Sequence, residues 1–396
     1  HRPMKQYNRI MLGKGGLYAD KCLEENFIGA DFDIREDLTY KLKDNWRIFN
    51  DEYVPIYMAA NPEKTKVSAG LACGFLWTIC KGLNIGDIVL CPNGRGSYMV
   101  GEITGDYYYA AGEVLPHRRN VKWSKLINRN DMSENLRHST GSIGTCCDIA
   151  KYQEEIERLI HDASDINKPS VTPSLPKVST YHERELHKIF CSYLRNSRSI
   201  YAKTIFHEKS TSKDKEQKWV HPDIIGVSFK DYSNDNTLSL LNAIDIKSSV
   251  YLYSFELKRE IKNDYNLKEY YFQALSNSSW ANFGYLVAYE IDESLKEEME
   301  RLNNAFGIGI IRLQAKDDST QILYPAREHD LDYTTINKLC SINPDFNNFI
   351  NKVTKVMKSP TEYKSGSLLE LNKVCDEIFC DDKQVEAYCI EHNIPF

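Results

Sequence analysis

The stretch YSFELKRE, Tyr253–Glu260, joins an apolar strand to a group of charged residues. Side chains in a strand alternate between the two faces, so Glu256 and Lys258 share one face while Phe255 and Leu257 share the other. A carboxylate and an ammonium at the end of an otherwise buried strand predict one of two things. They form a surface ion pair, or they belong to a metal-dependent active site.

An acidic residue on the preceding strand supplies the second carboxylate that a metal site would need, although such a combination is by itself a weak signal. Hydrolysis of a phosphodiester needs an activated water and a sink for negative charge, and divalent metal ions supply both. Magnesium prefers hard oxygen ligands. Asp223, in HPDIIG, and Glu256 are therefore predicted metal ligands, with the carbonyl of Leu257 as a third oxygen. Lys258 is expected to orient the attacking water and to offset developing charge.

A second stretch, AIDIK, offers the same spacing of charges. Asp245 and Lys247 stand two residues apart, as Glu256 and Lys258 do. We prefer Glu256 because its strand is longer and more aromatic and leads through a polar loop into a strong helix. An isolated Glu-x-Lys is also common as a surface ion pair, which contributes only about 0–1 kcal/mol.

The order of elements around this strand predicts a mixed α/β core. YHERELHKIFCSYL reads as a helix, and the apolar positions that share its face are Leu186, Ile189, Phe190, Tyr193 and Leu194. Three strands, a helix, a strand, a helix and a strand follow it along residues 181–330. Residues 331–396 are expected to be mostly helical.

This order resembles the PD-(D/E)xK nuclease superfamily, and in particular the Mrr-like bacterial restriction endonucleases. The segments that carry the resemblance, within residues 181–315, are HERELH, WVHPDIIG, YSFELKRE, YYFQALSNSSWANFGYLVA and FGIGIIRL. The resemblance implies metal ligation by Asp223 and Glu256, a catalytic Lys258, and magnesium as cofactor with manganese as a substitute. It also implies an assisting glutamate on the first helix, where Glu183 fits better than Glu185, and a nearby glutamine, matched by Gln273.

Two polar segments of this half have open interpretations. SNSSWAN, which surrounds Trp280, either supports the active-site helix or simply caps it. The basic segment that precedes HPDIIG either binds phosphates or forms a solvated loop; its lysines are Lys209, Lys213, Lys215 and Lys218.

The N-terminal half predicts a small, strongly curved β-barrel with flanking helices. GKGG, at residues 13–16, lacks the spacing and the Ser or Thr of a phosphate-binding loop, so we interpret it as a glycine turn. NGRG, at residues 93–96, lies between the β-rich runs IGDIVLCP and SYMVGEITG, which is typical of a hairpin. The stretch HRRNVKW predicts a further strand.

These segments are similar to the N-terminal region of some Mrr-type restriction enzymes and to PUA-like domains, the group that includes EVE and ASCH domains. The resemblance implies nucleic-acid binding, with a flipped, modified base held in an aromatic pocket. Arg118 and Arg119 are candidate phosphate ligands, with structural ion pairs as the alternative. The candidate pocket walls, for which core packing is the alternative, are Trp46, Trp77, Tyr107, Tyr109 and Trp123.

The 396 residues therefore predict an α+β protein of two domains. We expect a recognition domain over 1–160, a proline-rich linker over 161–180, a nuclease domain over 181–330 and a helical extension over 331–396. Eleven cysteines without a CxxC pair predict reduced thiols and a cytoplasmic location. No apolar run approaches the roughly 20 residues that span a membrane.

The function expected from the sequence is cleavage of double-stranded DNA, with modified bases as candidate targets. One metal site cuts one strand, so we expect a homodimer on DNA. Defence against foreign DNA follows from the resemblance alone. Two alternatives remain open: a nucleic-acid reader whose nuclease fold no longer cleaves, and an RNase of the same fold.

Overall fold

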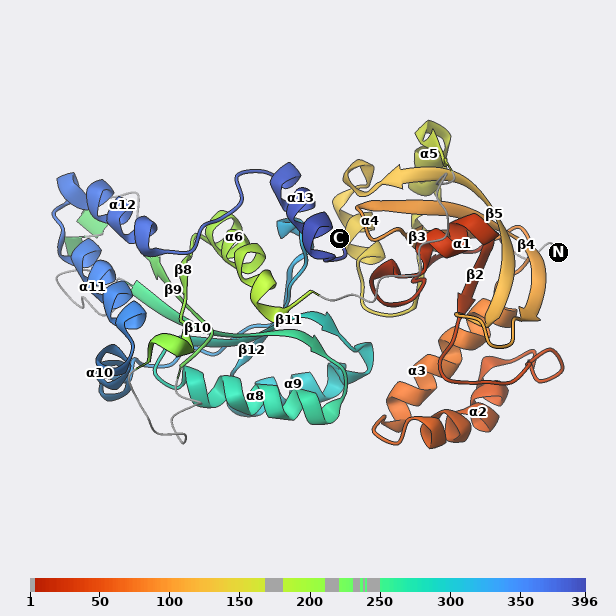
Figure 1. The fold of residues 1–396 in the computed structure, drawn as a ribbon, viewed down its shortest axis with the longest axis horizontal. Coiled ribbons are helices and arrows are strands. Elements are labelled where there is room, and N and C mark those ends of the chain that lie inside the picture. Colours follow the sequence, from red (N-terminus) through yellow and green to blue (C-terminus); the bar gives the residue numbers. More distant parts are fainter. Residues whose placement is uncertain (1–3, 168–180, 211–220, 231–235, 238, 241–249) are drawn as a thin grey trace. The chain divides into compact units, whose positions relative to one another are not determined.

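The computed structural model describes residues 4–167, 181–210, 221–230, 236–237, 239–240 and 250–396. The chain forms two compact units. The first comprises His1–Tyr181, Asp292–Ser294 and Glu386–Phe396, and the second comprises His182–Ile291 and Leu295–Val385. Each unit holds one sheet with helices around it (Figure 1). The expected α+β class is confirmed at this level.

The first unit is built on a seven-stranded sheet. Its strands are β1 (Tyr7–Ile10), β2 (Phe27–Ala30), β3 (Ile88–Pro92), β4 (Ser97–Tyr109), β5 (His117–Asn128), β6 (Cys146–Asp148) and β7 (Ser164–Asp165). The order is β2-β5-β4-β3-β1-β6, with β7 added to β5, and only β1 and β3 run parallel. The β4–β5 register shifts twice, at Val100/Gly101 and at Ile103/Tyr107, and such shifts bend long strands.

The two glycine turns expected in this unit are present. Residues 93–96 join β3 to β4, and Gly94 and Gly96 have φ angles of 73° and 87°, which favour glycine. GKGG contains a short 3-10 turn, Lys14–Gly16. The last residue of the chain lies against the hairpin turn, where Gly96 N–H donates to the Phe396 carbonyl at 3.0 Å.

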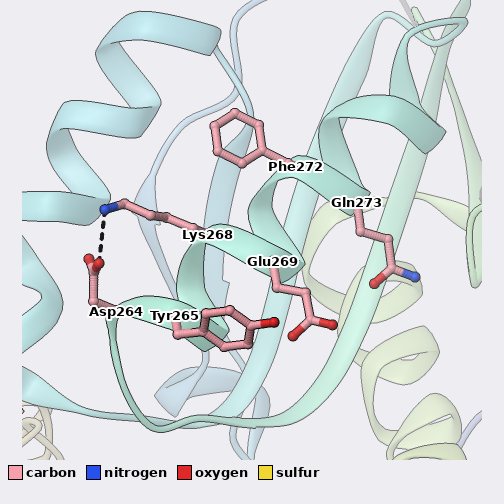
Figure 2. A pocket seen from close by; sticks show the side chains of 6 residues that line it. All are labelled: Asp264, Tyr265, Lys268, Glu269, Phe272 and Gln273. Atoms are coloured by element: carbon pink, nitrogen blue, oxygen red, sulfur yellow. Dashed lines mark hydrogen bonds and ion pairs between the residues drawn. The ribbon is translucent and has the colours of Figure 1, made fainter. Parts of the chain in front are cut away.

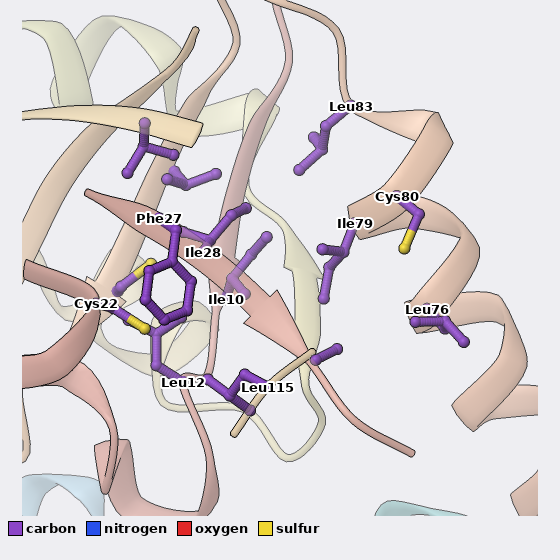
Figure 3. Close-up of a cluster of buried hydrophobic side chains, with 14 of the residues drawn as sticks. Ile10, Leu12, Cys22, Phe27, Ile28, Leu76, Ile79, Cys80, Leu83 and Leu115 are labelled. Carbon is purple, nitrogen blue, oxygen red and sulfur yellow. The ribbon is translucent and has the colours of Figure 1, made fainter. Parts of the chain in front are cut away.

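The helices that accompany this sheet within residues 4–167 are α1 (Ala19–Glu25), α2 (Trp46–Ala60), α3 (Lys66–Trp77), α4 (Glu134–Thr140) and α5 (Gln153–Asp162). Helix α3 continues from Trp77 as a π-helical turn, Thr78–Gly82. Apolar side chains from β1, β2 and this turn meet in one core, in which Ile10, Phe27 and Ile79 are fully buried (Figure 3).

The first unit extends into the range expected for the linker. Helix α5 continues to Asp162, and β7 pairs with β5 through Lys125↔Asp165. The expected boundary at residue 160 is therefore too early, because a two-residue strand is too weak a signal to stand out in a polar sequence. Residues 168–180, which hold the three prolines, lie outside the described residues.

The second unit is built on a six-stranded sheet with the order β13-β12-β11-β10-β9-β8. Its strands are β8 (Tyr201–Thr204), β9 (Ile224–Phe229), β10 (Val250–Ile261), β11 (Phe283–Ile291), β12 (Gly309–Arg312) and β13 (Gln321–Tyr324). Strands β10, β11 and β12 are parallel, and the remaining pairs are antiparallel. Helix α6 (His187–Arg198) lies above this sheet, and α8 (Asp264–Ser278) and α9 (Lys296–Phe306) lie below it (Figure 1). The predicted order of elements is confirmed, with β13 in addition.

The C-terminal residues are helical, as expected: α10 (Tyr333–Ile342), α11 (Pro344–Lys358), α12 (Lys364–Val374) and α13 (Asp382–His392). The first three are part of the second unit's core rather than an appendage to it. Phe346, Phe349 and Val353 of α11 are buried in the same cluster as Leu252 and Trp280. The end of the sheet that carries β8 and β9 is thus closed by a segment that follows it in the sequence.

All eleven cysteines are free thiols. Among the residues that the structure describes, no helix is both long enough and apolar enough to cross a bilayer.

Candidate active site

Neighbouring strands β9 and β10 bring Asp223 and Glu256 together. Asp223 directly precedes β9, and its backbone N–H donates to the Phe255 carbonyl at 3.1 Å. Its Oδ2 accepts the Leu257 N–H at 2.8 Å. This bond holds the Asp223 carboxylate against the part of β10 that carries Glu256. Glu256 is fully buried, although ionised carboxylates are rarely found there without partners. The two predicted metal ligands therefore occupy one site.

The two carboxyl groups influence each other strongly. Burial and the charge of Asp223 raise the pKa of Glu256 well above its ordinary value. Burial acts on Asp223 in the same direction, but His207, the Leu257 N–H, Lys258 and His187 outweigh it and hold the pKa of Asp223 below its ordinary value. The pair is therefore arranged to hold either one shared proton or a cation.

The chemistry of the pair suits a hard divalent cation. Glu256 Oε1 accepts a hydrogen bond from Asn277 Nδ2 at 2.8 Å, whereas the buried Oε2 has no hydrogen-bond partner among the described residues. A buried, unpartnered carboxylate oxygen beside a second carboxylate fits Mg²⁺ or Mn²⁺. The described residues contain no cluster of three or more His, Cys, Asp or Glu side chains arranged for a metal, so this site supplies two carboxylates. Leu257 contributes its N–H to Asp223, and a metal-binding role for its carbonyl remains a prediction.

Lys258 and Glu183 lie at the edge of the pair. Lys258 is half-buried, and its Nζ lies 4.7 Å from the centre of the Tyr270 ring. Glu183 begins the 3-10 turn Glu183–Leu186 that leads into α6. Burial raises the pKa of Glu183, the charge of Lys258 opposes this rise, and Asp223 adds to it. Glu183 is therefore close enough to Lys258 and Asp223 for their charges to act on its carboxyl group.

Glu185, the other candidate on this turn, has a local role. Its Oε2 accepts the His182 N–H at 3.2 Å and completes a capping box at the start of the turn. Such a cap satisfies backbone donors that the helix leaves unpaired. The structure therefore brings Glu183, and not Glu185, to the carboxylate pair.

The segment SNSSWAN ends helix α8, and it also holds Asn277 in contact with Glu256. Ser278 Oγ donates to Ser254 Oγ at 2.9 Å, and Trp280 Nε1 donates to the Asn277 carbonyl at 2.9 Å. These bonds hold Asn277 over Glu256. Gly284 on β11 permits the close approach, because a Cβ there would lie 2.5 Å from Ser278 Cβ. Sequence reasoning selected the segment but missed Asn277 as its functional side chain.

Gln273 shares a helix face with two residues of the site. It lies three residues after Tyr270 and four before Asn277, which places all three on one side of α8. Figure 2 shows Gln273 pointing away from the Asp264–Lys268 ion pair, at one end of an open pocket of about 560 Å³. Tyr265, Glu269 and Phe272 line the same pocket. No described contact joins Gln273 to either carboxylate, so its catalytic role remains a prediction.

Two histidines adjoin Asp223 that the sequence did not single out. His207 Nε2 lies 3.6 Å from Asp223 Oδ1. His187, on α6, is joined to Thr204 by a 2.8 Å contact between its Nδ1 and Thr204 Oγ1, and its charge acts on Asp223. His187 ends the segment HERELH, where the sequence directed attention to the glutamates, and His207 lies in none of the segments that carry the resemblance. The pairing of β8 with β9 is what brings both histidines near Asp223.

The candidate phosphate-binding lysines are mostly outside the described part of the chain. Lys209 forms an exposed ion pair with Asp345, at 3.3 Å, and its Nζ lies 5.1 Å from the Phe206 ring centre. Lys213, Lys215 and Lys218 lie outside the described residues, as do Asp245 and Lys247 of AIDIK. For these five residues the sequence-based interpretations remain untested.

Arg118 and Arg119 lie in the interior of the first unit, which corrects the expectation of surface phosphate ligands. Arg118 donates to the carbonyls of Val114 and Leu115 and stacks 3.9 Å from the Phe27 ring centre. Arg119 is 3% exposed. Both are enclosed because the start of β5 is paired on both sides, with β2 and with β4.

We expect Arg119→Ala to destabilise the first unit by about 2–4 kcal/mol, because several buried carbonyls would lose a charged donor. Arg119 donates to the carbonyls of Gly105 and Leu83, each at 2.7 Å. Arg95, which is exposed and paired with Asp20 at 3.0 Å, is the matched control and should change stability by less than about 1 kcal/mol. Chemical denaturation measures both. Unchanged stability of Arg119→Ala, with weaker and less salt-dependent DNA binding, would restore the phosphate role.

The five aromatic candidates do not form one group. Trp123 is a core residue whose Nε1 donates to the Cys22 carbonyl at 2.9 Å. Trp77 Nε1 donates to the Lys43 carbonyl, and Trp46 is exposed at the start of α2. Tyr107 and Tyr109 lie together, each packed against the His117 ring. Of the five, these two tyrosines are the ones that the structure brings side by side.

Comparison with known proteins gives one result, for the first unit. Residues 12–149 match a domain family of unknown function, DUF8426. No curated protein and no solved structure matches the chain. The family match spans the hairpin and HRRNVKW but does not reach the residues that carry the carboxylate pair.

Proposed function

We propose that this chain is a metal-dependent endonuclease that cleaves double-stranded DNA and senses base modification or DNA structure. The observation that carries the proposal is the pair formed by the fully buried Glu256 and the partly buried Asp223, with Lys258 at its edge. An unpartnered carboxylate oxygen is costly in a protein interior, and a cation offsets that cost. The order of strands and helices, similar to the PD-(D/E)xK nucleases, agrees with this interpretation.

Each residue of the site has a role in this proposal. Asp223 and Glu256 would hold the metal ion, which activates water and stabilises charge on the phosphate. Asn277 orients Glu256 through its Nδ2, and the Leu257 N–H orients Asp223. The ammonium group of Lys258 would take part in orienting the attacking water and would offset the negative charge that develops on the phosphate.

The first unit is proposed to recognise the target, as a PUA-like domain would. Its support is the resemblance of the hairpin and the adjoining strand, together with the rings of Tyr107 and Tyr109, which both pack against His117. Stacking of a base on an aromatic ring contributes about 1–3 kcal/mol. Restriction of foreign DNA in a cytoplasm is the biological role we propose.

Cleavage assays test this function directly. Purified protein is incubated with Mg²⁺ or Mn²⁺ and with plasmid DNA, phage genomes carrying different cytosine modifications, and RNA, with chelator as the blank. Metal-dependent cuts in DNA are expected. Cleavage of RNA alone would identify an RNase, and tight binding without cleavage of any substrate would identify a silent reader.

We expect the protein to act on DNA as a dimer, because one metal site cuts one strand and two are needed for a double-strand break. Sedimentation of the protein–DNA complex measures its stoichiometry while the products are followed on a gel. A complex with one protein chain that yields linear plasmid in a single step would contradict this expectation.

A further inference from the structure

The C-terminal part of the second unit reaches the candidate active site through Asp376. This residue follows α12 and is bonded to β8, where its N–H donates to the Ala202 carbonyl at 3.0 Å. Its carboxylate accepts both the backbone N–H of Thr204, at 2.9 Å on Oδ1, and the Thr204 hydroxyl on Oδ2. Thr204 is 4% exposed, so these bonds are sheltered from water.

The direction of the hydrogen bonds follows from the number of protons available. An ionised carboxylate only accepts, and a threonine hydroxyl has one proton to donate. Because Thr204 gives that proton to Asp376, its oxygen can only accept from His187 Nδ1, 2.8 Å away. His187 must therefore carry a proton on Nδ1.

The other ring nitrogen of His187, Nε2, is left as an acceptor. The ring lies in the neighbourhood of Asp223, because Thr204 pairs with Ile224 and the next residue, Ile205, donates its N–H to the Asp223 carbonyl at 2.9 Å. Burial lowers the pKa of His187, and the charge of Arg184 lowers it further. The charges of Asp223 and Asp376 act in the opposite direction, but the net effect lowers the pKa and favours the neutral ring. In a neutral ring protonated on Nδ1, the lone pair is on Nε2. The described hydrogen bonds of His187 use Nδ1 and not Nε2, and the residue is partly exposed to solvent.

We propose that Asp376 and Thr204 are positioning residues that fix His187 with Nε2 as a hydrogen-bond acceptor, and that Nε2 orients the water that attacks the phosphate beside Asp223. The inference rests on the proposed nuclease function and adds to it a role for the C-terminal segment. In metal sites, residues that orient a functional side chain in this way change activity by roughly 10–100-fold when replaced.

Asp376→Asn is the decisive variant, because it reverses the direction of the two hydrogen bonds of the Thr204 hydroxyl, to residue 376 and to His187. The Thr204 N–H still needs an acceptor, so the amide oxygen stays opposite it and the Nδ2 faces the hydroxyl. Thr204 then donates to His187 Nδ1, and the proton of His187 moves to Nε2. Nitrogen-15 NMR of the imidazole, assigned with His187→Ala, should show the Nδ1–H form in the wild type and the Nε2–H form in Asp376→Asn.

Kinetics then test the role of this tautomer. For Asp376→Asn and Thr204→Val, we expect kcat to fall about 10–100-fold with KM nearly unchanged. Thr354→Val is the control, because that hydroxyl bonds only the Ile350 carbonyl of its own helix in the described structure. An Nε2–H form in the wild type overturns the proposal, and so does a full kcat in Asp376→Asn. Absence of any cleavage by the wild type would count against the nuclease function, while NMR would still decide the tautomer.

Discussion

Replacement of Glu256 by glutamine is expected to abolish DNA cleavage and to leave DNA binding almost unchanged. Glutamine keeps the size of the side chain and its contact with Asn277, but it removes the charge that would hold a metal ion. Losses of about 10²–10³-fold are typical when one preorganised electrostatic group is removed from an active site, and we expect at least this. Asp223→Asn should behave in the same way, because the two carboxylates act as one unit.

Glu260 provides the matched control on the same strand. It lies four residues after Glu256 in β10 and is paired with Arg259 at 3.1 Å and with Lys262 at 3.2 Å. Plasmid cleavage by Glu260→Gln should stay close to that of the wild type, while the rate of Glu256→Gln falls to background. Full activity in Glu256→Gln would refute the assignment. If Glu256→Gln stayed active and lost cleavage only when Asp245 was changed as well, the metal ligand would be Asp245 of AIDIK instead of Glu256.

The second large effect is expected from the single methyl group added in Gly284→Ala. That methyl would lie 2.5 Å from Ser278 Cβ and 2.8 Å from Ile308 Cδ1, closer than carbon atoms can pack. Overpacking of this kind costs about 1–3 kcal/mol. The end of α8 must move to relieve the contact, and Asn277 moves with it. We therefore expect both a lower melting temperature and a fall in kcat.

The two effects can be separated by measuring cleavage well below the melting temperature, where the variant is still folded. Gly366→Ala is the control, because no heavy atom lies within 4 Å of a Cβ at that position in α12. Alanine in a helix is favoured over glycine, so this variant should be as stable as the wild type or slightly more stable. A kcat equal to that of the wild type in folded Gly284→Ala would show that the close packing of α8 against β11 contributes to stability but not to cleavage.

The sequence predicted the elements of the second unit better than those of the first, because each of these elements is marked by residues within its own stretch of sequence. The run of aromatic residues before Glu256 and the helix after it identify β10 and α8 directly, and Asp223 follows from the strand before. Asn277, His187 and Asp376 could not be found in this way. Their proximity to the carboxylate pair depends on how α8, α6 and the end of α12 pack, which no local pattern encodes.

The errors in the first unit have a physical cause as well. HRRNVKW has the composition of an exposed basic strand, but β5 begins between two partners, and its first three residues are all buried. Arginine tolerates this position because its guanidinium group can bond several carbonyls at once. Composition alone does not distinguish an arginine that contacts phosphate from one that satisfies the backbone.

The late position of Asp376 in the chain has a consequence for how the protein is made. A ribosome delivers Asp223, Glu256 and Lys258 well before it delivers Asp376, and domains generally fold as they are completed. On the proposals above, the nascent chain would carry the metal ligands but not the residue that sets His187. A cell translating this protein would thus be exposed to little nuclease activity from unfinished chains, since full activity would await synthesis of almost the whole second unit.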